Sequence, residues 1–112
     1  MSESKDEIRL RHMLDYSREA IALLQSKTRS DLCTDRVLQL ALVRLIEIIG
    51  EAAGRVSHET QLQHREIPWP QMISMRNRLI HGYDFVDIDI LWQTIHEDLP
   101  PLVSELKNIL PK

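Results

Sequence analysis

Aromatic residues, glycine and cysteine are all scarce in this chain of 112 residues. Aromatic residues make up 4% of it, which is too few for a platform that stacks several nucleic-acid bases. The chain has only three glycines and few alternating apolar runs, which argues against a fold rich in β-strands. Because Cys33 is the single cysteine, we expect neither an internal disulfide bond nor a cysteine-based zinc site.

Long apolar runs and an excess of positive charge are also missing. No stretch of about 18 apolar residues exists, so no membrane span is expected. The first nine residues are polar, which argues against a signal peptide. Lys and Arg number 14 against 17 Asp and Glu, giving a net charge of −3, which excludes a broad basic coat for nucleic acid but not a local patch. These absences predict a cytoplasmic protein without a cofactor, and the six-residue spacing of His58 and His64 is poor for a metal site.

Apolar residues make up 43% of the chain and recur mainly at helical spacing. The length fits one domain covering residues 1–112. We expect helices over about 4–25, 31–57 and 70–83, and a fourth from 87 onward that keeps one phase across Pro100 and Pro101. Ser30 or Asp31 is expected to cap the second helix. The sequence therefore predicts an all-α, up-and-down bundle of four to five helices.

The expected second helix is apolar on most of its circumference. In a domain this small, such a helix is either central in the bundle or buried by a second copy of the chain. Gly50 and Gly54 would let another backbone approach closely. A narrow polar stripe on this helix comprises Arg44, Glu47, Glu51 and Arg55. This stripe is either a solvated or intersubunit salt-bridge face, or the lining of a functional cleft.

Residues 76–83, with the sequence RNRLIHGY, crowd chemically versatile side chains into eight positions. An imidazole can act as base or acid near neutral pH, and a guanidinium can bind phosphoryl oxygens, so these types suit metal-free cleavage of RNA. Arg76 and His81 are five residues apart, about 140° around a helix, so one helix does not aim both at one atom. This mismatch favours a homodimer, which would also double the charge of Arg76 and Arg78 at one cleft.

Each of these residues also has an ordinary structural interpretation. Arg76 could form a surface salt bridge with Asp84 or Glu66, and His81 could cap a helix end. Tyr83 could be a half-buried packing residue.

The motif Arg76-x4-His81-x-Tyr83 resembles the Arg-x4-His-x-Tyr motif of HepT-type toxins in the HEPN superfamily. The resemblance continues in order and spacing through three segments that span most of the chain: ALVRLIEIIGEAAGRVS (41–57), IPWPQMISMRNRLIHGYDFVD (67–87) and ILWQTIHEDLPPLVSEL (90–106).

The resemblance implies an all-helical homodimer and a metal-independent endoribonuclease, the toxin of a type VII toxin–antitoxin pair. Arg76 and His81 would then be catalytic and Asn77 a supporting polar residue. The implied partner is a minimal nucleotidyltransferase antitoxin, which would inhibit the toxin by attaching AMP to Tyr83. The competing hypotheses are a non-catalytic helical module that binds a nucleotide or this partner, and a purely structural helical subunit.

Overall fold

The computed structural model describes residues 4–82 and 84–111. Two short strands, β1 (Ile80–His81) and β2 (Phe85–Val86), pair antiparallel, with Ile80 opposite Val86. Helices form nearly all the rest, which confirms the predicted all-α class. They are α1 (Lys5–Leu24), α2 (Arg29–Thr34), α3 (Arg36–Arg55), α4 (His58–Gln63), α5 (Trp69–Ile73), α6 (Met75–Leu79), α7 (Ile88–Gln93) and α8 (Leu99–Ile109), with a π-helical turn η1 (Thr94–Asp98) between the last two.

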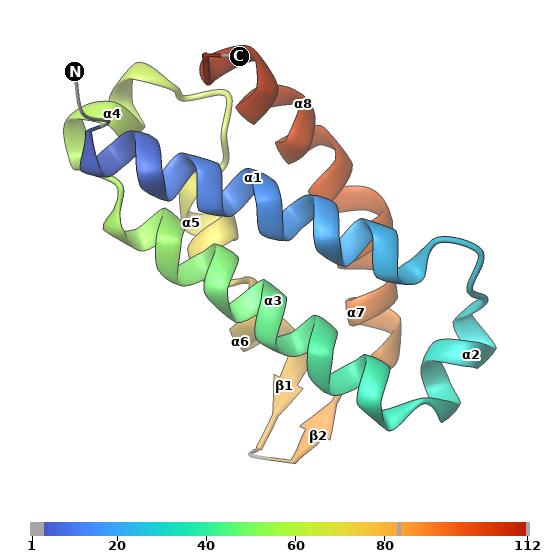
Figure 1. Cartoon of the computed structure of the whole chain (residues 1–112). Helices are drawn as coiled ribbons and strands as arrows, with labels where there is room; N and C mark the ends of the chain where they lie inside the picture. The colour runs from blue at the N-terminus through green and yellow to red at the C-terminus, as the bar shows by residue number, and fades with distance from the viewer. Residues whose placement is uncertain (1–3, 83, 112) are drawn as a thin grey trace.

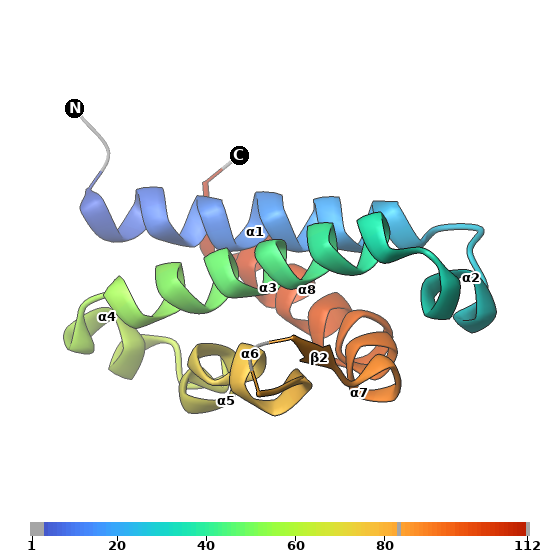
Figure 2. The ribbon, with the colours of Figure 1, turned by 90° about the horizontal axis from the view of Figure 1, so that it is seen from below.

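The two longest helices, α1 and α3, lie side by side and run antiparallel (Figure 1). Helix α8 returns along α1, and the short helices α5 and α6 lie against α3 (Figures 1 and 2). The β1–β2 hairpin follows α6 and leads into α7. The long helices therefore form the frame, and the segment that carries the Arg-x4-His motif lies against one side of it.

The core fills the space between these helices. Fully buried Leu and Ile side chains each stabilise the fold by about 1.5–3 kcal/mol relative to exposure. Trp69 is buried as well, and its indole Nε1 donates hydrogen bonds to the carbonyl oxygens of Gln61 and His64. Among the described residues, no helix is both long and apolar enough to cross a membrane. The largest completely buried side chains include Met13, Leu32, Leu42, Ile46, Ile49, Met72, Met75, Leu79, Leu91 and Leu99.

The prediction of one helix over 31–57 is wrong, because α2 and α3 are separate. Asp35 has an extended backbone, with φ −106° and ψ 95°, and its side chain accepts the Leu38 N–H to begin α3. Thr28, rather than Ser30 or Asp31, is the N-cap of α2. Thr28 and Asp31 exchange hydrogen bonds in a capping box.

The close backbone approach predicted for the two glycines of α3 is confirmed at Gly50. A Cβ added there would lie 3.1 Å from the Met72 carbonyl oxygen and 3.2 Å from that of Ile73. At Gly54 an added Cβ would meet only the Ile73 Cγ1 atom, at 3.9 Å. The neighbour that Gly50 admits is therefore α5 of the same chain.

The expected helix over 70–83 is also wrong. Ser74, with φ −99° and ψ 6°, separates α5 from α6, and the extended Ile80 ends α6 after Leu79. Gly82 has φ +70° and follows β1, so its left-handed conformation serves the hairpin turn instead of a helix end. The chain then folds back, and the Asp87 N–H donates to the Leu79 carbonyl oxygen at 2.7 Å.

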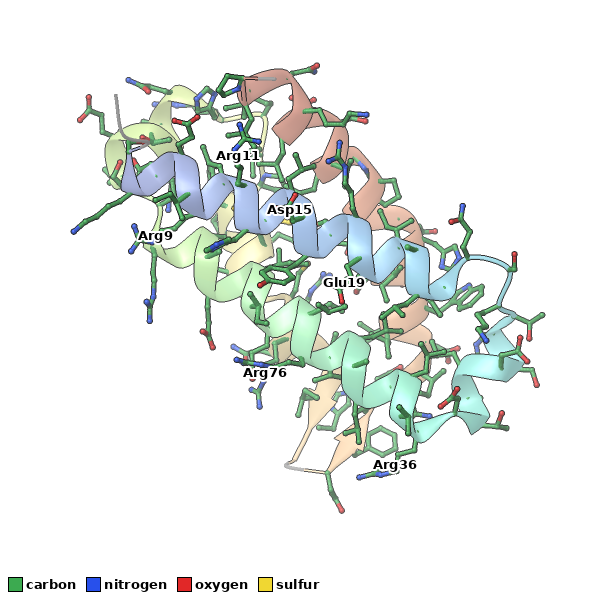
Figure 3. All side chains as sticks on the ribbon, viewed as in Figure 1. Arg9, Arg11, Asp15, Glu19, Arg36 and Arg76 are labelled. Carbon is green, nitrogen blue, oxygen red and sulfur yellow. The ribbon has the colours of Figure 1, made fainter. Side chains whose placement is uncertain are left out.

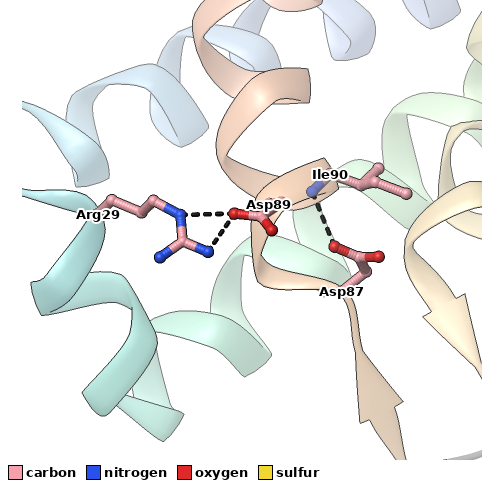
Figure 4. A network of polar contacts seen from close by, with 4 residues as sticks. All are labelled: Arg29, Asp87, Asp89 and Ile90. Carbon is pink, nitrogen blue, oxygen red and sulfur yellow. Dashed lines mark hydrogen bonds and ion pairs between the residues drawn. The ribbon is translucent and has the colours of Figure 1, made fainter.

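The fourth predicted helix is confirmed as one continuous run, α7–η1–α8, with the two prolines in the first turn of α8. Its start is fixed by two carboxylates (Figure 4). Asp87 accepts the Ile90 N–H at 3.1 Å, and Asp89 forms an ion pair with Arg29 that ties α7 to α2. The hairpin consequently enters α7 at a capped and anchored point.

Candidate active site

Helix α6 presents the first half of the motif to solvent. Met75 and Leu79 are four residues apart, share one helix face and are completely buried. The positions between them, Arg76, Asn77 and Arg78, are therefore exposed. Burial of two apolar side chains thus fixes where the polar ones point.

Glu47 of α3 holds Arg76 in place. Its Oε2 lies 2.8 Å from the Arg76 Nε, while its Oε1 accepts a hydrogen bond from the Arg44 Nη1. In the described part of the chain, the two terminal amino groups of Arg76 make no hydrogen bond, so they stay available to a ligand. Figure 3 shows Arg76 beside α3. The ordinary interpretation of Arg76 as a salt-bridge partner of Asp84 or Glu66 therefore names the wrong carboxylate.

Arg76 lines a shallow groove between α3 and the α5–α6 segment, and this groove has a volume of about 370 Å³. Two acids of the predicted polar stripe, Glu47 and Glu51, line this groove together with Arg76 and Asn77. Half of the stripe therefore lies beside the motif arginine. The full lining is Glu47, Gly50, Glu51, Gly54, Ile73, Arg76 and Asn77.

His81 lies on β1 and does not line this groove. Its side chain is 56% exposed, its Nε2 lies 3.6 Å from the Asp87 Oδ2, and its ring centroid lies 5.7 Å from that of Phe85. The interpretation of His81 as a helix-end cap is wrong, because Ile80 and His81 are extended. Asp87 was not among the site residues predicted from the sequence. Its position as the N-cap of a helix that follows a turn was the signal that it folds back toward His81.

The remaining predicted site residues are not gathered at the groove. The Arg78 Nη2 lies 3.1 Å from the Asp98 Oδ2, so this arginine faces η1 and does not line the groove. Tyr83 lies outside the described residues. Within residues 4–82 and 84–111, no three His, Cys, Asp or Glu side chains come together in a way that could hold a metal ion.

Comparison with known proteins places this arrangement in a family. Residues 13–109 match the family model described as "Ribonuclease HepT-like". The chain is 40% identical over 95 residues to "Probable ribonuclease HepT" of Thermococcus cleftensis, covering 81% of this chain and 86% of that protein. It is 37% identical over 103 residues to "Putative RNase TTE0752" of Caldanaerobacter subterraneus subsp. tengcongensis, covering 92% of each.

No solved structure gave a significant match to the chain. The matched residues include α3, the groove, the hairpin and all of α8, so the site lies wholly within the shared region. The chain belongs to the HepT-like ribonuclease family.

Proposed function

We propose that this protein is an endoribonuclease toxin of a type VII toxin–antitoxin pair, which cleaves RNA without a metal ion at a cleft shared by two copies of the chain. The observation that carries the proposal is the guanidinium of Arg76, which is oriented through its Nε by Glu47, lines the groove and belongs to a side chain that is 46% exposed. Such a fork binds two oxygens of one phosphate and stabilises the charge that develops on them.

The absence of His81 from the lining of the Arg76 groove, as the structure describes it, supports the dimer. One chain presents the guanidinium in a groove of α3 and the imidazole on a hairpin, and His81 does not line that groove. A second copy could bring its own hairpin to the groove. Asn77, which lines the groove beside Arg76, would add a polar contact to the bound strand.

Exposed apolar side chains supply a surface for that second copy. Val37 and Leu40 of α3 are 78% and 52% exposed, and Phe85 of β2, next to His81, is 58% exposed. Leu40 is seven residues before Glu47 and therefore shares its helix face. Dimerisation through this face would bury apolar area that otherwise meets water.

The reaction assigned to the site is transesterification at phosphorus. One imidazole takes the proton of a 2′-hydroxyl, whose oxygen bonds to the adjacent phosphorus while the bond to the 5′-oxygen breaks. A second imidazole donates a proton to that leaving oxygen, and the products carry a 2′,3′-cyclic phosphate and a 5′-hydroxyl. His81 of each copy would supply these two roles, and Asp87 would hold each ring from the side facing α7.

The direct test is cleavage of single-stranded RNA in the presence of EDTA, with the products' ends identified by mass spectrometry. We expect His81→Ala and Arg76→Ala each to lower the cleavage rate by about 10²–10³-fold without unfolding, because both side chains are exposed. His58→Ala, at another exposed histidine, is the matched control and should cleave normally. Cleavage that persists in pure His81→Ala protein contradicts the proposal, and RNA binding without cleavage by the unmodified chain favours the non-catalytic module.

Mixed dimers test the shared cleft. A dimer that joins one unmodified chain and one His81→Ala chain, purified through two different tags, should be as impaired as the His81→Ala homodimer if both imidazoles serve one reaction. Half of the normal activity would mean that each chain works alone. If the chain remains monomeric at all concentrations, the shared cleft is excluded.

The proposed inhibitor is a minimal nucleotidyltransferase that transfers AMP from ATP to the hydroxyl of Tyr83 and releases pyrophosphate. The adduct would bring a negative charge and a bulky group within two residues of His81, where it would compete with an RNA phosphate. Co-expression with such an enzyme should add one or more AMP masses to the chain and abolish cleavage. Tyr83→Phe should receive no AMP and stay active.

A further inference from the structure

A second groove lies between the first half of α1 and the last turns of α3, with a volume of about 310 Å³. Its floor is apolar and includes the buried Ala52, while its rim is polar. The rim side chains from α1 are Lys5, Arg9 and His12, and Arg55 faces them from α3.

The charge of this rim is positive although the chain as a whole is acidic. Lys5, Arg9 and Arg55 face a single lining carboxylate, Glu51. None of the three cations forms a salt bridge within the described residues, and the Arg9 Nη1 donates only to the Lys5 carbonyl oxygen. The nearby acid Asp6 accepts hydrogen bonds from Ser57 and Thr60 and also attracts Arg9 electrostatically, so it offsets part of this positive charge.

Arg18, Arg36 and Arg65 also lack a salt bridge within the described residues, but four arginines have one. Arg29, Arg44, Arg76 and Arg78 each pair with a carboxylate. Cations that converge on one groove without such partners attract an anion most strongly, because no internal charge has to be displaced.

The two grooves adjoin at Glu51, which lines both of them. Glu47, Gly50 and Gly54 face the groove of Arg76, whereas Ala52 and Arg55 face the basic groove, so α3 forms a ridge between the two. Figure 3 shows Arg9 on the α1 side of this ridge and Arg76 on the other side. A polymer bound at Arg76 can therefore continue across α3 into the basic groove.

We propose that the basic groove binds backbone phosphates of the RNA strand whose cleaved phosphate lies at Arg76. The inference rests on the proposed function and adds a second contact region on the same chain. No Trp, Tyr or Phe lines this groove among the described residues, so it would hold the strand mainly by its phosphates, and His12 is the one ring in its described lining on which a base could stack. The narrow basic region would give an acidic protein the RNA affinity that its overall charge opposes.

The test uses His81→Ala protein, so that RNA is bound and not consumed, and follows the anisotropy of a labelled single-stranded oligonucleotide at several salt concentrations. Adding Arg9→Glu or Arg55→Glu should weaken binding at least tenfold. Each should also reduce the slope of log affinity against log salt by about 0.7 for every RNA phosphate that the protein no longer neutralises.

Arg18→Glu is the matched control. It makes the same charge reversal on the same helix, but nine residues from Arg9 and hence on the opposite face, about 180° around the axis. Circular dichroism checks that all variants are folded. Equal RNA affinity for Arg9→Glu and Arg18→Glu overturns the inference.

Two further outcomes separate this inference from the proposed function. If His81→Ala binds RNA in a way that depends on Arg76 but not on Arg9 or Arg55, the proposed function stands and the inference fails. If AMP or inorganic phosphate binds with the same dependence on Arg9 and Arg55 while the oligonucleotide binds no more tightly than AMP, the groove is a site for small anions, and the inference again fails. An unmodified chain that neither binds nor cleaves RNA refutes the proposed function itself.

Discussion

Arg76 and His81 belong to one motif but depend on very different parts of the molecule. Arg76 lies on α6, a helix anchored by its completely buried residues Met75 and Leu79. Glu47 of the long helix α3 holds the Arg76 guanidinium. His81 lies on a two-residue strand with an exposed side chain, and its carboxylate neighbour is 3.6 Å away. Paired strands this short are marginal on their own. The residue proposed to bind phosphate is therefore positioned by the core, and the residue proposed to transfer protons by a local turn.

The largest effect is expected from a substitution in the core that supports Arg76. Gly50→Ala and Gly54→Ala gain the same helix propensity, but only the first puts a Cβ 3.1–3.2 Å from two carbonyl oxygens of α5. We expect Gly50→Ala to be less stable than Gly54→Ala by about 1–3 kcal/mol in urea unfolding. Gly50→Ala should also displace α5 and weaken cleavage through Arg76. Equal stability of the two variants would contradict the close packing.

A smaller loss should follow from releasing Arg76 without disturbing the core. Glu47→Ala removes the carboxylate that orients the guanidinium, and we expect a drop of about tenfold in kcat/KM for RNA cleavage, or about 1.4 kcal/mol. Glu47→Gln keeps an acceptor for the Arg76 Nε and should lose less. Stability should change by no more than about 0.5 kcal/mol in either variant, because the contact lies near the surface. Unchanged or faster cleavage by Glu47→Ala would mean that Glu47 does not position Arg76.

The hairpin offers the reverse experiment. Gly82 has φ +70° and open space around it, so alanine there is strained only through its backbone, at a cost of about 1 kcal/mol. We expect Gly82→Ala to weaken the hairpin and lower cleavage several-fold while global unfolding changes little. Asparagine tolerates this conformation better, so Gly82→Asn should be milder. Amide hydrogen exchange at Asp87, whose N–H donates to the Leu79 carbonyl oxygen across the hairpin, measures the local opening, and normal protection in Gly82→Ala would contradict the prediction.

The smallest expected effect is on stability and concerns Asp6, near the start of α1. Hydrogen bonds from the Ser57 hydroxyl, the Thr60 hydroxyl and the Ser57 N–H hold the pKa of Asp6 below its ordinary value of 3.8. Because the folded pKa is the lower one, this carboxylate stabilises the fold above about pH 4, and the contribution is lost as pH falls through the folded pKa.

Asp6→Asn should therefore lower the Tm by about 2 °C or less at pH 7, since the site is exposed, and by less as the solution becomes more acidic. A Tm difference that grows on acidification would reverse the sign and exclude this interpretation.

The sequence predicted the long helices well and the motif segment poorly, for a physical reason. The expected first helix over 4–25 is α1, because its apolar side chains repeat over many turns and Ser4 caps it. The breaks at Asp35 and Ser74 depend on single backbone conformations that periodicity does not report. Ile80, Phe85 and Val86 favour strands, but each run is too short to outweigh the helical signal of Arg76 to Leu79.

The candidate site was predictable in chemistry and not in geometry. Residue types alone singled out Arg76 and His81, and the polar stripe of α3 contained Glu47 and Glu51. That Glu47 would meet Arg76 depends on the packing of α5 and α6 against α3, which no local pattern encodes. Asp87 was not predicted as a site residue, because an acid at the start of a helix is already explained by the helix dipole. Its proximity to His81 arises only when the hairpin folds back.

The π-helical turn and the two prolines at the start of α8 constrain the number of residues that can connect α7 to α8. The Leu99 N–H donates to the Thr94 carbonyl oxygen, five residues back, so this turn contains one residue more than a regular α-helix would. Deleting one exposed residue here, such as Glu97, would leave α7 and α8 facing the core as before. It would also move Pro100 and Pro101 into a regular helix, where an interior proline costs about 3 kcal/mol. A related chain that lacks the extra residue of this turn is thus expected to lack the prolines as well.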